Sequence, residues 1–315
     1  MKETLEPINH LTRHGVEIRI DHRFITLGAA LTVLSEPVSH EHELVKETRQ
    51  RLFALREDPS VKWLAEMDQK YIILGLGMQT AQLDDPPNFK VNDPETIPDF
   101  IREQFSNPPG KDMSKHLSSF WQKSDLNTLI KNQKTQWRNV VDDIAAIIEK
   151  IDLIAFQKNF FGEFPYQPVI IPLANLAPSR IDGMGTANDK ETYAICLLAG
   201  KRSYKEYRTW EILELMQHEA SHPIVDKIWR LNPQIPIKCG DFIEGKYPLK
   251  ERFKQIYRDV NSRFVESLIQ ASSWFFIREI RGEEEAEEFL QEVMQRTGDS
   301  INPSREYPIL KEPCE

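Results

Sequence analysis

The pentapeptide His-Glu-Ala-Ser-His at positions 218–222 is the most chemically informative pattern in the chain. The residues just before it, 210–217, place apolar side chains at helical spacing and contain no Gly or Pro, which predicts an α-helix. Residues four apart project from one face of a helix, so His218 and His222 can bind one Zn²⁺. Glu219 would lie beside the ion, where a carboxylate can accept a proton from an attacking water. The pattern therefore predicts a metal hydrolase.

Proline at position 223 follows the motif directly. Proline disfavours helical backbone in the residue before it and clashes with the carbonyl four residues back. We therefore expect the helix to end or kink at His222, which would leave this ligand on the last turn. A pattern this short also occurs by chance, so two histidines and a glutamate on a solvated helix face remain an alternative.

A catalytic zinc needs a third protein ligand, usually from another element, and an open fourth position. Our candidate is Glu266, which lies in a stretch free of Gly and Pro, residues 250–280, that predicts one long and largely apolar helix. A carboxylate in such a helix needs a partner, which could be the metal or an arginine of the same helix, Arg263 or Arg278. Weaker candidates for the third ligand are Asp226, Asp241, Glu244 and Asp259.

The motif with a glutamate on a later helix resembles the gluzincin branch of zinc metallopeptidases. Residues 215–225 and the apolar segment 169–173 more closely resemble an uncharacterised family assigned to bacterial metallopeptidases and catalogued as a domain of unknown function. The resemblance extends from Val16 to the helix of Glu266. It implies a peptide or protein substrate, Zn²⁺ as cofactor, Glu219 as general base and three zinc ligands: His218, His222 and Glu266.

The sequence predicts an α+β protein that is mostly α, with an N-terminal helical part (1–160) and a zincin-like catalytic part (161–315), or one continuous domain. The segments 169–173 and 193–198 are short and rich in β-formers, and they flank a loop with two glycines, 181–189. We expect them to be antiparallel strands connected by this loop, within a small sheet that is antiparallel or mixed. The resemblance implies that such a strand runs beside the zinc helix and binds extended peptide.

Alternating apolar residues predict a strand at 16–20, and apolar stretches predict helices at 24–34, at 63–80 and across most of 124–161. Breaker residues at 84–98 and 107–110 predict surface loops in preference to a flap.

A second group of histidines and acids lies at positions 39–43. It could suggest another metal site. However, Ser39 is a good N-cap and acidic residues favour a first helical turn, so we favour a solvated helix start.

The net charge of −9 and the lack of a concentrated basic patch argue against binding to nucleic acid or to an anionic membrane. No run reaches the roughly 18 apolar residues of a membrane span, and the opening residues lack the apolar core of a secretory signal. We therefore expect a cytoplasmic protein. Its three cysteines are too few and too scattered for a disulfide framework, so we expect reduced thiols.

The sequence thus favours a zinc-dependent hydrolase acting on peptide bonds. Two other classes stay open: a non-catalytic peptide-binding module with a structural or vestigial metal site, and a metal-free helical scaffold. The reaction would also need a second electrophile beside the metal, and the sequence does not choose among Tyr193, Tyr207 and Tyr257. It does not predict the oligomeric state.

Overall fold

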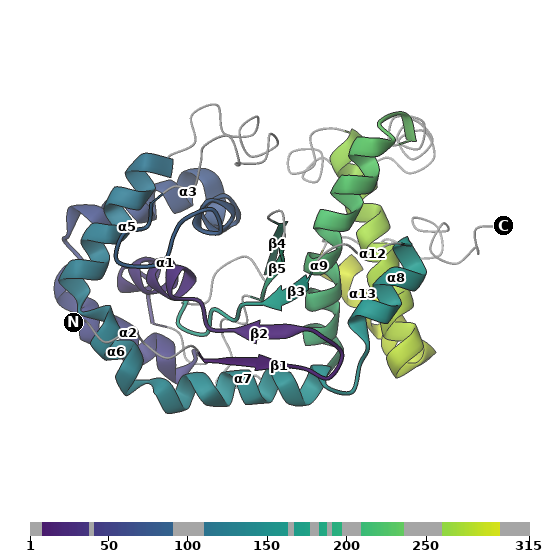
Figure 1. Cartoon of the computed structure of the whole chain (residues 1–315), viewed down its shortest axis with the longest axis horizontal. Helices are drawn as coiled ribbons and strands as arrows, with labels where there is room; N and C mark the ends of the chain where they lie inside the picture. The colour runs from purple at the N-terminus through teal and green to yellow at the C-terminus, as the bar shows by residue number, and fades with distance from the viewer. Residues whose placement is uncertain are drawn as a thin grey trace. The chain divides into compact units, whose positions relative to one another are not determined.

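A computed structural model describes residues 8–37, 41–90, 110–162, 167–176, 183–187, 191–196, 209–235 and 260–296 (Figure 1). The strands are β1 (Asn9–Leu11), β2 (Glu17–Arg19), β3 (Gln167–Ile170), β4 (Gly183–Ala187) and β5 (Glu191–Cys196). The helices are α1 (His22–Val33), α2 (Glu43–Leu52), the 3₁₀ turn η1 (Phe53–Leu55), α3 (Pro59–Thr80), α5 (Gly110–Ser124), α6 (Leu126–Asn132), α7 (Lys134–Ile148), α8 (Leu153–Phe161), α9 (Thr209–Leu231), α12 (Val260–Arg281) and α13 (Glu283–Arg296).

These elements confirm the prediction of a mostly helical α+β protein with a small mixed sheet. None of the helices in the described ranges combines the length and apolar composition needed to cross a membrane.

The chain forms two compact units from interleaved segments. The first comprises Met1–Lys150 and Tyr166–Tyr207, and the second comprises Ile151–Pro165 and Arg208–Glu315. The sequence had suggested a single division near residue 160. The difference arises because β3 pairs in parallel with β2. This pairing places the segment Tyr166–Tyr207 in one unit with the N-terminal part of the chain. The sheet and α9 thus belong to different units, and the packing of a strand beside the zinc helix stays a prediction.

The sheet of the first unit has the strand order β1-β2-β3-β5-β4. β3 and β5 are parallel, with Val169 opposite Tyr193, whereas β4 and β5 are antiparallel, with Gly185 opposite Ala194. The prediction of a loop across 181–189 was therefore wrong, because most of this segment forms β4. It was also wrong that the flanking strands are antiparallel, because the additional strand reverses the chain between them.

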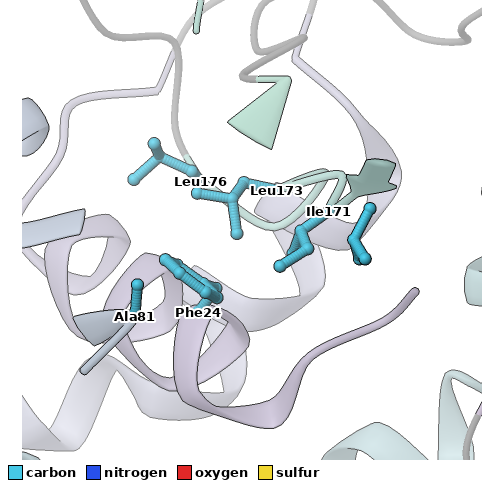
Figure 2. Close-up of a cluster of buried hydrophobic side chains, with 6 residues drawn as sticks. Phe24, Ala81, Ile171, Leu173 and Leu176 are labelled. Carbon is cyan, nitrogen blue, oxygen red and sulfur yellow. The ribbon is translucent and has the colours of Figure 1, made fainter. Parts of the chain in front are cut away.

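In the core of the first unit, residues of α1 and of the end of α3 pack against β3 and the residues that follow it. Phe24 of α1 is fully buried and belongs to one apolar cluster, which Figure 2 shows. Asp21 caps the helix that carries Phe24 by accepting a hydrogen bond from the backbone N–H of Arg23 at 2.9 Å. The other buried members of the cluster are Ala81, Val169, Ile171, Leu173 and Leu176.

The start of α2 differs from the solvated helix start that the sequence suggested. Ser39 lies outside the described residues, and the N-cap is His42, whose Nδ1 accepts a hydrogen bond from the N–H of Leu44 at 3.2 Å. Glu41 is buried because Arg49, two turns along the helix, donates two hydrogen bonds to its carboxylate at 2.6 and 2.7 Å. Glu41 therefore forms a buried structural ion pair, whereas the side chain of Glu43 is 67% exposed.

We expect Gly28→Ala to destabilise the first unit. A Cβ at Gly28 would lie 2.9 Å from Oδ1 of Asn175, and Asn175 is held in place by donating to the carbonyl of Ile25 and accepting from Thr32, both at 2.8 Å. Overpacking lowers the free energy of unfolding by about 1–3 kcal/mol, whereas replacing Gly by Ala in a helix raises it by about 1 kcal/mol. Urea unfolding would measure the net loss of stability. The same substitution made in an Asn175→Ala background should cost less, and an equal cost in both backgrounds would disprove the clash.

Candidate metal centre

The helix that carries the histidine motif, α9, is longer than the sequence predicts. It continues through Pro223 to Leu231, so of the two expectations for His222 the helix end was wrong and the kink stays a prediction. The residues beyond the proline are held by tertiary packing, since Val225 is buried against Val265 and Ile269 of α12. Such packing can offset the cost of about 3 kcal/mol that an internal proline imposes on a helix.

Helix α12 lies antiparallel to α9 in the second unit. Nε2 of Gln217 donates to Oγ of Ser272 at 3.3 Å, at one end of a series of contacts between the helices. Further along α9, His222 faces Glu266, which lies closer to the start of α12. Residue numbers therefore rise along one helix as they fall along the other. This arrangement brings a carboxylate from a distant part of the sequence to the histidine motif.

Three side chains converge where the helices face each other. Nε2 of His218 lies 3.5 Å from Oε2 of Glu266, and Nε2 of His222 lies 3.6 Å from Oε1 of the same carboxylate. Two ligand atoms of a tetrahedral zinc are about 3.4 Å apart when each lies about 2.1 Å from the ion. One ligand atom from each residue lies within 4.8 Å of the other two. The group His218, His222 and Glu266 can therefore hold a metal ion.

The environment keeps both imidazoles in the form that binds metals. The side chains of His218, His222 and Glu266 are 12%, 22% and 21% exposed. Burial lowers the pKa of His222 to about 4. Burial, and then repulsion from His222, lower the pKa of His218 well below its ordinary value of 6.5. Both histidines are thus neutral at pH 7, and each offers a nitrogen lone pair.

The predicted base, Glu219, is buried on α9 and is 6% exposed. It follows His218 by one residue and precedes His222 by three, so helical geometry places it on the flank of the ligand face. The structure thus keeps a carboxylate next to both histidines in the helix, away from bulk solvent.

Two further residues contact His218, and the sequence did not single them out. Oε1 of Glu214 lies 3.7 Å from Nδ1 of His218, and Nε2 of Gln270 lies 3.2 Å from the same nitrogen. The spacing of four residues from Glu214 to His218 was a usable signal, because it places both side chains on one helix face. Gln270 comes from α12, and only the packing of the two helices reveals its contact.

The alternative ion-pair partner Arg278 does not serve Glu266. It lies twelve residues further along α12, about 18 Å at 1.5 Å per residue. Its guanidinium instead pairs with Glu283 at 2.6 Å and lies over the ring of Trp274.

Several other candidates cannot be placed. Outside the described residues lie Asp241, Glu244, Asp259, Tyr207 and Tyr257, and the described side chains do not include those of Tyr193, Asp226 and Arg263. Within the part of the chain that is described, His218, His222 and Glu266 make up the only group of three or more potential metal ligands.

Comparisons with known proteins add no assignment. No protein-family model matches the chain, and no match was found among curated proteins or among solved structures. The resemblance to gluzincins stays a prediction from the sequence.

Proposed function

We propose that this chain is a zinc-dependent hydrolase that cleaves peptide bonds in peptides or proteins. The observation that supports the proposal is the convergence of His218 and His222, four residues apart on α9, with Glu266 of α12. Three protein ligands leave one position open for solvent or substrate, which is the arrangement of catalytic zinc. A structural zinc site would instead be closed by four protein ligands.

The chemistry of the ligand atoms favours zinc over Ca²⁺ and Mg²⁺. Two imidazole nitrogens and one carboxylate oxygen form a mixed set that suits Zn²⁺. Ca²⁺ and Mg²⁺ prefer sites made of oxygen ligands alone. The neutral state of His218 and His222 at pH 7 supports the same choice, because zinc binds the deprotonated imidazole nitrogen.

The protein side chains have distinct roles in the proposed reaction. When bound, Zn²⁺ lowers the pKa of a coordinated water toward neutrality and polarises the carbonyl that the water attacks. Glu219 accepts the proton of the attacking water and returns it to the amine that leaves. Partial burial of His218, His222 and Glu266 limits solvent around the site, which strengthens the electrostatic interactions within it.

Cleavage of a mixed peptide library tests this function. The purified chain should cut a subset of peptides, a chelator should stop the reaction, and added Zn²⁺ should restore it. Cleavage that persists in the chelator would contradict a metal mechanism. A protein that retains zinc and binds peptides without cutting them would instead support the non-catalytic binding module.

A further inference from the structure

The ring of His218 lies between two carboxylates. On one side its Nε2 is 3.5 Å from Oε2 of Glu266, and on the other its Nδ1 is 3.7 Å from Oε1 of Glu214. The side chain of Glu214 is only 10% exposed, so its interaction with the imidazole is weakly screened by water. A neutral imidazole carries one N–H and can donate to only one of the two carboxylates.

The proposed metal site would decide which nitrogen carries that proton. To hold a cation together with Glu266, as the proposed function requires, Nε2 of His218 would have to offer its lone pair. The proton then resides on Nδ1, which faces Glu214. Ligating histidines commonly donate this second N–H to a carboxylate, which fixes the ring and makes the ligand more basic.

Gln270 also faces Nδ1 of His218, but it cannot select the tautomer. Its Nε2 lies 3.2 Å from Nδ1, and its buried Oε1 has no hydrogen-bond partner among the residues that the structure describes. A flip of the side-chain amide exchanges these two atoms, so Gln270 can either donate to Nδ1 or accept from it. The carboxylate of Glu214 has no N–H to offer and, when ionised, can only accept, which makes Glu214 the selective neighbour.

We propose that Glu214 is a positioning residue that holds the proton of His218 on Nδ1 and thereby directs Nε2 to the metal. The inference rests on the proposed metal site. Oε1 of Glu214 lies 3.7 Å from Nδ1 of His218 and would move about 1 Å closer to reach ordinary hydrogen-bond length. Glu214 lies one helical turn before His218, so rotation of its side chain suffices for this movement.

Zinc affinity of three variants provides the first test. We expect Glu214→Gln to weaken binding about 10-fold or more, measured by competition with a chromogenic chelator. The matched control Glu211→Gln, one turn earlier on α9, should bind as the parent does. Glu214→Asp keeps the acceptor but loses a methylene, so it should lose less affinity than Glu214→Gln. A role in packing alone predicts the reverse order, because glutamine preserves the shape of the side chain.

The imidazole tautomer provides a second test that packing alone would not change. ¹⁵N spectra of histidine-labelled protein should show His218 protonated at Nδ1 in the zinc-loaded parent. In the chelator-treated protein, Glu214→Gln should shift the neutral ring toward the Nε2–H form. An unchanged tautomer together with unchanged zinc affinity would overturn the role of Glu214. If the parent itself binds no zinc, the proposed function fails first, and the two failures are thus distinguishable.

Discussion

Glu219→Gln is expected to abolish hydrolysis while zinc stays bound. Glutamine keeps the size of the buried side chain, but its amide cannot accept the proton of the attacking water. Loss of a general base lowers turnover by about 10²- to 10⁴-fold. Turnover of a cleaved library peptide and zinc content, measured on the same sample, would show the two effects separately.

A conservative substitution elsewhere on α9 controls for this result. Glu211→Gln makes the same chemical change two turns before His218 and should keep both zinc and turnover. Equal turnover by Glu219→Gln and the parent would refute Glu219 as the base. Loss of zinc from Glu219→Gln would show that this carboxylate supports the metal instead.

Glu266→Ala is expected to cause the largest loss of metal. Both carboxylate oxygens face an imidazole, at 3.5 and 3.6 Å, so truncation removes a ligand and leaves only the two histidines. The decrease in affinity should exceed the roughly 10- to 100-fold that follows loss of a residue behind a ligand. Zinc per chain after exhaustive dialysis, followed by competition titration, would measure it.

Glu279→Ala is a suitable control because Glu279 is an exposed carboxylate of the same helix. It should retain zinc at the stoichiometry of the parent. Unchanged zinc content in Glu266→Ala would instead transfer the third ligand to another residue. Asp241, Glu244 and Asp259 would then be the next positions to test.

The sequence predicts the helices of this chain better than its strands. Apolar residues predict helices at 24–34 and 63–80, and the structure has α1 at 22–33 and α3 at 59–80. The stretch 124–161 is helical as predicted, although it is divided into α6, α7 and α8. β4 was missed because its two glycines suggest a loop, whereas pairing with β5 provides its hydrogen bonds.

Tertiary contacts account for the remaining differences. Pro223 predicts a helix end or a kink from local geometry, but packing of the following turn against α12 keeps α9 continuous. Pairing of β2 with β3 joins segments about 150 residues apart, and no local pattern shows this. The two units are therefore interleaved in a way that the sequence did not predict.

The site itself was easier to predict than the units that contain it. His218 and His222 follow from helical spacing alone, and Glu266 follows from the cost of an acidic side chain in an apolar helix. The contacts of Glu214 and Gln270 with Nδ1 of His218 depend on side-chain orientation and on the packing of α9 against α12.

Anomalous diffraction from a crystal of the zinc-loaded chain would test the metal site most directly. We predict one zinc peak within about 2.0–2.2 Å of Nε2 of His218, Nε2 of His222 and a carboxylate oxygen of Glu266, with the fourth position filled by solvent. A peak away from these three residues, or a fourth protein ligand that closes the site, would contradict the proposed catalytic centre.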